Sequence, residues 1–148
     1  MTPEDKELLL RDLCCRLPYG VKCENYNHVY GKNIFKVTDI RDNGCVCGTI
    51  NSKHGWAVFD PLELKPYLFP MSSMTEEQYY SLQKSGILNN CSHSYEYVNP
   101  HIHGVSFIFK EFKTYSLELI EWLNKNHFDY RGLIPLGLAN DATNLNIY

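Results

Sequence analysis

The sequence predicts an α+β fold in which a small curled antiparallel sheet or partial barrel is covered by three to four helices, within a single domain of residues 1–148. Two observations predict it. Apolar residues recur at helical spacing near both ends of the chain, whereas between Val21 and Phe59 they alternate with polar residues as in strands. No internal repeat, low-complexity tract or linker divides the 148 residues.

The first expected helix has a strong start signal. Thr2 offers a capping hydroxyl, Pro3 suits the first helical position, and two acidic residues follow near the positive end of the helix. The helix is expected to end by Leu17, because the residue before Pro18 is disfavoured in helical geometry. On a helical wheel an apolar stripe faces the core, and its members are Leu9, Leu10, Leu13, Cys14 and Leu17.

The following part of the chain is predicted to form four or five short antiparallel strands. Asn43 and Gly44 give the clearest hairpin signal, since this dipeptide supplies positive φ angles at a tight turn. A loop is expected at 51–55. The expected strands are Val21–Glu24, His28–Tyr30, Asn33–Ile40, Cys45–Ile50 and Trp56–Phe59.

The middle of the chain alternates between extended and helical signals. Two prolines restrict Leu64–Pro70 to an edge strand or an extended crossing segment. A capping box made by Thr75 and Gln78 then begins the next helix. Strands are expected at 95–98 and 105–112, separated by a polar loop.

The last part of the chain is predicted to supply a pair of helices that pack over the sheet. The first helix has Ser116 as its cap and ends at Asn126 in the left-handed conformation. Asp129 is expected to cap a second, short helix over Tyr130–Ile134. A final short strand is expected at Leu145–Tyr148.

Composition disfavours several classes of function. The formal net charge is −3 and the charged residues are scattered, so no basic cluster is available for binding bulk nucleic acid. No apolar run reaches the about 20 residues that cross a bilayer, and the acidic N-terminal stretch differs from a signal peptide. We therefore expect a cytoplasmic protein with no membrane partner. The eleven tyrosines suit either half-buried sheet edges or a ligand surface.

Catalytic and metal-binding motifs are not evident in the sequence. Cys45 with Cys47 and His101 with His103 repeat one i, i+2 spacing and in principle offer four zinc ligands. Structural zinc sites usually contain Cys-x-x-Cys, so we expect reduced thiols and neither a metal nor a cofactor. The chain also has no Gly-rich phosphate loop, nucleophile elbow or His-Glu-x-x-His, and we expect that it is not an enzyme.

Arg131 is the leading candidate for ligand binding. It follows Tyr130 at the start of an expected helix, where backbone N–H groups favour an anion, so its guanidinium is expected to hold a phosphate while Tyr130 stacks. The alternative is that Arg131 pairs with Asp129 or a nearby helix carboxylate and fixes the corner. A second anion site is predicted before another helix start, and the alternative there is helix capping alone; its residues are Ser72, Ser73, Tyr67 and Lys65.

Three motifs occur together along the chain: LLLRDLCCRLPYGVKC at 8–23, LKPYLFPMSSMTEEQ at 64–78 and EWLNKNHFDYRGLIPLGLA at 121–139. This combination resembles a family of small uncharacterised proteins carried by phages, prophages and other mobile elements of gut bacteria. The resemblance covers most of the chain and is weakest at 87–113. It implies a phage-type accessory protein in a bacterial cytoplasm and transfers no catalytic residue.

Two functions of different classes fit these observations. The first is a non-catalytic binder that sequesters a small phosphate-bearing, cyclic nucleotide-like messenger of host defence. The second is a protein-interaction module that inhibits a host protein or assembles with itself into a homo-oligomer. The expected partner is a small anionic nucleotide-like ligand in the first case and a protein in the second.

Overall fold

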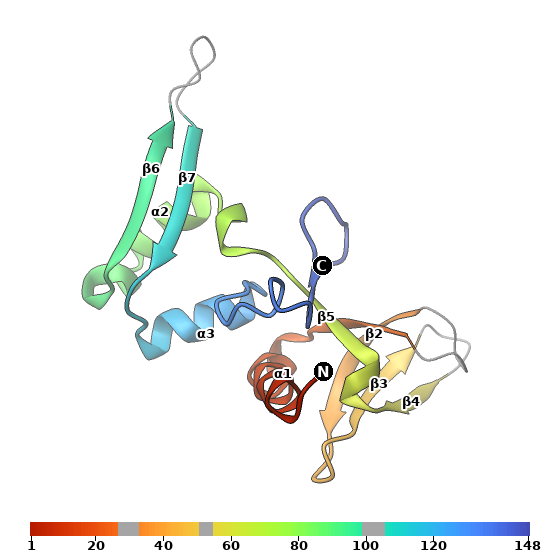
Figure 1. The fold of residues 1–148 in the computed structure, drawn as a ribbon. Coiled ribbons are helices and arrows are strands. Elements are labelled where there is room, and N and C mark those ends of the chain that lie inside the picture. Colours follow the sequence, from red (N-terminus) through yellow and green to blue (C-terminus); the bar gives the residue numbers. More distant parts are fainter. Residues whose placement is uncertain (27–32, 51–54, 99–105) are drawn as a thin grey trace. The chain divides into compact units, whose positions relative to one another are not determined.

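The computed structural model describes residues 1–26, 33–50, 55–98 and 106–148. Their internal contacts group them into two compact units, 1–68 with 131–148 (unit 1) and 69–130 (unit 2), and each is described by itself. The fold is mixed α+β with a mostly antiparallel sheet, as predicted, and the described residues contain three α-helices (Figure 1). The strand expected at His28–Tyr30 lies outside the described residues.

Helix α1 (Pro3–Arg16) starts in unit 1 as the sequence predicts. Thr2 Oγ1 accepts a hydrogen bond from Asp5 N at 3.2 Å, and the Asp5 carboxylate accepts one from Thr2 N at 2.7 Å, which completes a capping box. Leu9 and Leu13 are fully buried against the sheet. The expected apolar stripe is wrong at Cys14, which is exposed, because the buried arc of the helix turns instead towards Asp12 and Arg16.

Unit 1 contains one six-stranded sheet. Neighbouring strands are antiparallel except for the last pair, β5 and β8, which is parallel. One face of this sheet packs under α1 and contains the core. The strand order is β4 (Trp56–Phe59), β3 (Val46–Ile50), β2 (Asn33–Ile40), β1 (Lys22–Asn25), β5 (Leu64–Leu68) and β8 (Asn140–Asp141).

The hairpin between β2 and β3 lies where the sequence places it. Only Gly44 takes a positive φ, at 79°, so the expectation of a positive φ at both turn residues is wrong for Asn43. The Asn43 side-chain oxygen accepts a hydrogen bond from Cys45 N at 3.0 Å, which stabilises the turn without left-handed geometry. A β-bulge between Val37 and Asp39 then shifts the register further along β2.

Strand β5 is more central than its two prolines predict. It pairs with β1 on one side and with β8 on the other, but β8 is opposite Tyr67 and Leu68 only. On the β8 side no described residue is opposite Pro66, so its missing N–H leaves no gap in that pairing. The short strand is at Asn140–Asp141, and the strand expected at Leu145–Tyr148 does not form.

Unit 2 consists of two helices and a hairpin. Helix α2 (Glu76–Lys84) has the predicted capping box, and α3 (Leu117–Lys125) begins at the predicted cap. Strands β6 (His93–Val98) and β7 (Ser106–Phe112) pair antiparallel beside α2 (Figure 1). Short 3-10 helices at Met71–Ser73 and Ile87–Asn90 belong to unit 2, and those at Leu17–Tyr19 and Pro61–Glu63 belong to unit 1.

The segment after α3 differs most from its prediction. Asn126 keeps a negative φ of −97°, and His127 takes the left-handed conformation with a φ of 58°. The helix expected at Tyr130–Ile134 is replaced by turns, two of which use the positive φ of Gly132 and Gly137. In these turns Arg131 has no helix start beside it.

Among the described residues, no helix is both long and apolar enough to cross a bilayer.

Candidate functional site

The sheet of unit 1 brings four functional side chains into one transverse row. Lys22 of β1 is directly opposite Lys36 of β2, Lys36 is opposite Thr49 of β3, and Thr49 is opposite Trp56 of β4. Residues opposite one another in a sheet project from the same face. Since neighbouring strands lie roughly 4.8 Å apart, the row spans about 14 Å between its outermost Cα atoms. Two ammonium groups, a hydroxyl and an indole therefore follow one another across four strands.

A cleft of about 560 Å³ lies along this row. Trp56 is 52 % exposed, and Ile34, also exposed, adds an apolar side chain to the same region. The Arg41 guanidinium lies 4.8 Å from the centre of the Trp56 ring, which is a cation–π contact. The described lining residues are Lys22, Ile34, Phe35, Lys36, Thr49, Ile50, Gly55 and Trp56.

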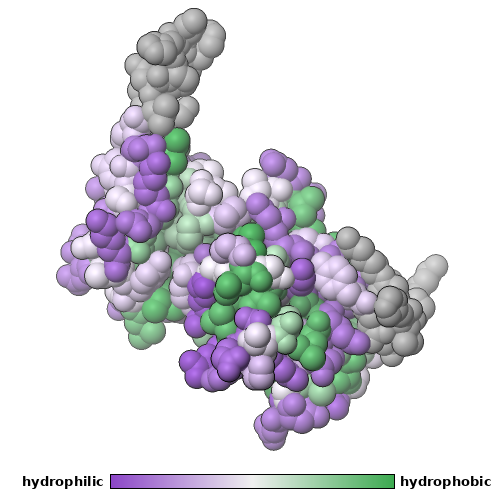
Figure 2. Space-filling model, viewed as in Figure 1, coloured by the Kyte–Doolittle hydropathy of each residue, from purple (hydrophilic) through white to green (hydrophobic). Residues whose placement is uncertain are grey.

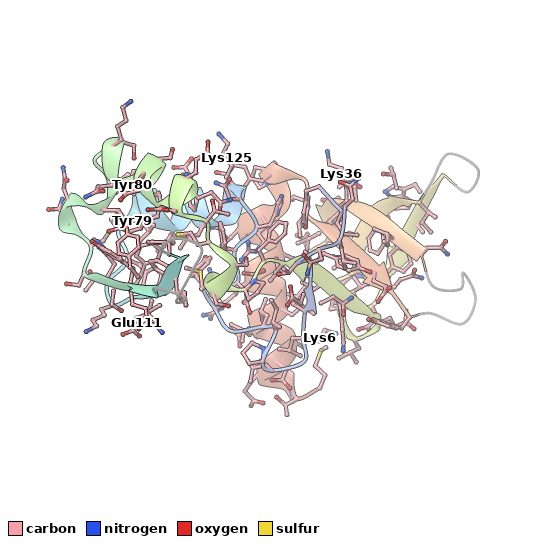
Figure 3. All side chains as sticks on the ribbon, turned by 90° about the horizontal axis from the view of Figure 1, so that it is seen from above. Lys6, Lys36, Tyr79, Tyr80, Glu111 and Lys125 are labelled. Carbon is pink, nitrogen blue, oxygen red and sulfur yellow. The ribbon has the colours of Figure 1, made fainter. Side chains whose placement is uncertain are left out.

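Within the described part of the chain, no carboxylate forms an ion pair with either lysine of the row. Lys22 donates to the Ile147 carbonyl and lies 5.7 Å from the centre of the Tyr148 ring. The Lys36 side chain extends outward from the ribbon (Figure 3). It packs over Gly20, where an added Cβ would lie 2.7 Å from Lys36 Cε. Like charges directly opposite each other destabilise a sheet, so an anion bound between them would relieve this cost.

The neighbouring row contains a buried carboxylate. Glu24 of β1, opposite Ile34, is 3 % exposed and accepts hydrogen bonds from Tyr67 Oη and Asn140 Nδ2, both at 3.0 Å. The Asn140 amide also contacts Tyr26 Oη at 3.2 Å. These bonds hold the Glu24 carboxylate in place, in the row next to the two lysines.

Tyr67 gives this network a measurable pH dependence. Burial, followed by the hydrogen bond to Glu24, raises the pKa of Tyr67 from 10 to about 12. Because the folded state holds this proton more tightly than the unfolded chain, the stabilisation is complete below pH 10 and is lost as the pH rises towards 12. We expect the free energy of unfolding to fall across this window, and to fall less in Tyr67→Phe. Urea unfolding at several pH values checks this; equal slopes for both proteins would contradict it.

A second polar cluster is buried between α1 and the chain beyond Tyr130. Asp12, which is fully buried, accepts two hydrogen bonds from Arg16, at 2.7 Å to Nε and 3.0 Å to Nη2. Arg131 Nε lies 3.4 Å from the same carboxylate, and Arg131 Nη2 lies 3.4 Å from Cys15 Sγ. One carboxylate thus holds two guanidinium groups, and we interpret this cluster as structural.

The sequence-predicted site residues of unit 1 lie in three different environments. Lys65 lies 5.7 Å from the Tyr26 ring, on the same sheet face as Glu24, to which it is opposite. Tyr67 is the buried donor to Glu24. Arg131 pairs with Asp12, a carboxylate of helix α1. This agrees with the alternative interpretation, in which Arg131 pairs with a carboxylate, but the partner is Asp12 and not Asp129.

The other three candidates belong to unit 2. Ser72 is exposed, and Ser73 Oγ donates to the Pro70 carbonyl at 2.8 Å; both lie in a 3-10 helix, while Thr75 caps α2. Tyr130 is half-buried with its ring 5.9 Å from that of Tyr115. Within unit 1 the structure brings Lys65 and Tyr67 onto the same sheet face as the row.

The residues of the row were missed because no motif joins them in the sequence. All four come from strands that the sequence predicts, but the register between those strands was not predicted. The Asn43–Gly44 turn would have been enough to align Lys36 with Thr49 if the bulge after Val37 had been anticipated.

The cysteines and the possible zinc ligands do not form a described site. All six cysteines are free thiols, and burial raises the pKa of Cys23 well above its usual range. His101 and His103 lie outside the described residues. Among the residues that are described, no group of three or more His, Cys, Asp and Glu side chains is arranged to hold a metal ion.

Comparison of the chain with protein-family models, with curated protein sequences and with solved structures gave no match.

Proposed function

We propose that the protein binds a small phosphate-bearing, nucleotide-like molecule on the open face of the unit 1 sheet. The observation that supports this most is the cross-strand row in which Lys22, Lys36, Thr49 and Trp56 line one cleft. The two ammonium groups suit a phosphate, the hydroxyl suits a sugar or phosphate oxygen, and the indole suits a planar base. Cleft volumes of a few hundred Å³ are typical of sites for such ligands.

The chemistry of the lining favours holding a ligand over transforming it. The described lining side chains include no carboxylate, histidine or cysteine that would act as a base or nucleophile. Glu24, the carboxylate of the neighbouring row on this face, already accepts two hydrogen bonds and is buried. We therefore propose sequestration, in the setting of a phage-type accessory protein in a bacterial cytoplasm, of a nucleotide-like messenger of host defence.

We also propose that the sheet curls around its ligand. The bulge between Val37 and Asp39 supports this, because an extra residue bends its strand and increases the local twist. It lies one position beyond the row, so the added bend falls on the strand that carries Lys36.

Lys36→Ala is the variant that tests the proposal. Removing one of two phosphate-binding ammonium groups is expected to weaken binding of a nucleoside monophosphate about tenfold, or about 1.4 kcal/mol. Calorimetric titration of the wild type and the variant, against a panel of mononucleotides and cyclic nucleotides, measures it. Lys125→Ala, the same change on an exposed lysine of α3 (Figure 3), is the matched control and should bind as the wild type. Heat from no nucleotide would end the proposal.

A second candidate function is supported by the tyrosines of unit 2. Tyr80, Tyr95 and Tyr97 are each more than 40 % exposed, and Tyr97 Oη contacts Tyr80 Oη at 2.8 Å and Glu76 at 3.0 Å. On its visible side the hairpin surface is hydrophilic to near neutral beside a narrow hydrophobic strip (Figure 2). Tyrosine is enriched in protein interfaces, so an interaction module or homo-oligomer is the alternative proposal. Light scattering of the purified protein tests self-assembly.

A further inference from the structure

The described lining of the cleft offers one exposed aromatic ring for stacking. Trp56 is the exposed aromatic among the described lining residues, and Arg41 covers one face of its ring at 4.8 Å. The other lining aromatic, Phe35, is 2 % exposed and is stacked on Phe59 at 4.4 Å in the core. Among the described lining residues, Trp56 is therefore the one exposed ring on which a ligand base can stack.

The cationic residues of the described lining are the two lysines, Lys22 and Lys36. Lys22 is already bonded to the Ile147 carbonyl, which fixes its ammonium group, and Lys36 is directly opposite it. Two lysines that are directly opposite each other on one sheet face suit a single anionic group between them. Thr49, on β3, lies between Lys36 on β2 and Trp56 on β4. This order matches a nucleotide, in which the sugar lies between the phosphate and the base.

We infer that the ligand of this cleft is a mononucleotide, with one base on Trp56 and one phosphate between Lys22 and Lys36. The inference rests on the proposed function and narrows it, because a cyclic dinucleotide brings a second base for which the described lining offers no ring face. Arg41 is then a positioning residue: it lies over one face of the indole, and we assign the base to the opposite face.

The test compares a nucleoside monophosphate with the cyclic dinucleotide of the same base. Each unit contains one tryptophan, Trp56 in unit 1 and Trp122 in unit 2. In a Trp122→Phe background, fluorescence quenching therefore reports Trp56 alone. We expect the cyclic dinucleotide to bind no more tightly than the mononucleotide, and the nucleoside without phosphate to bind at least about tenfold more weakly than the mononucleotide.

Arg41→Ala supplies a second readout. This variant uncovers the Trp56 face that Arg41 covers, so a second base can stack there. We expect the affinity for the cyclic dinucleotide, relative to that for the mononucleotide, to rise about threefold or more. Arg11→Ala removes an exposed arginine of α1 and is expected to leave this ratio unchanged. A wild-type dinucleotide preference of about tenfold, or a ratio that does not move in Arg41→Ala, overturns the inference and leaves the proposed function standing. Absence of binding by every nucleotide defeats the proposed function instead.

Discussion

Asp12→Asn is expected to lower the free energy of unfolding of unit 1 by about 3–5 kcal/mol, because it removes the carboxylate that two guanidinium groups share. Asp12 and Arg16 have no exposed surface, so solvent cannot replace the lost charge. This loss is a large part of the stability of a typical domain. Urea unfolding followed by Trp56 fluorescence, in the Trp122→Phe background, measures it for unit 1.

The same helix offers a matched control for Asp12→Asn. Glu7 and Arg11 form an ion pair with the same i, i+4 spacing at 2.6 Å, but their side chains are 64 % and 69 % exposed. Glu7→Gln is therefore expected to cost no more than about 0.5 kcal/mol. If Asp12→Asn does not fold, the apolar pair Asp12→Leu with Arg16→Met should recover folding. Equal losses for Asp12→Asn and Glu7→Gln would contradict the structural role of the buried cluster.

Gly48→Ala is expected to destabilise unit 1 by about 3 kcal/mol, through overpacking of a filled core. A Cβ at Gly48 would lie 2.2 Å from Phe35 Cδ2 and 2.7 Å from the Lys36 carbonyl oxygen. The Phe35 ring cannot move aside freely, because it stacks on Phe59 with ring centres 4.4 Å apart. Urea unfolding with the same fluorescence readout measures the change.

Two further variants separate overpacking from a general weakness of β3. Thr49→Ala changes the next residue, which is exposed, and is expected to have only a small effect on stability. Replacing the ring with a smaller side chain, as Phe35→Leu in the Gly48→Ala protein, should return part of the lost stability. It removes the clash with the ring and leaves the contact with the Lys36 carbonyl oxygen. If the Gly48→Ala protein is as stable as the wild type, strand β3 and the Phe35 ring are not packed as described.

Local signals in the sequence predicted most of the elements. Thr2, Thr75 and Ser116 each bond a backbone N–H of their own first turn, so a few neighbouring residues decide where each helix starts. The β2–β3 hairpin follows in the same way from Asn43 and Gly44.

Features that depend on distant residues were not predictable in this way. In the sequence Asp12 and Arg16 look like an ordinary exposed pair on a helix, and only the packing of the folded chain buries them. Arg131 was assigned to a helix start that does not form, since Gly132 takes a positive φ and its neighbours form turns. The row from Lys22 to Trp56 depends on the register of three strand pairs, one of which contains a bulge.

Mapping of backbone amide chemical shifts during titration with a nucleoside monophosphate tests the proposed site most directly. The largest shifts are expected at Lys22, Lys36 and Thr49 and at the backbone amide and indole N–H of Trp56, with the indole N–H of Trp122 unchanged. Shifts confined to residues 69–130, or no shifts at saturating ligand, would contradict a ligand site on the open face of the unit 1 sheet.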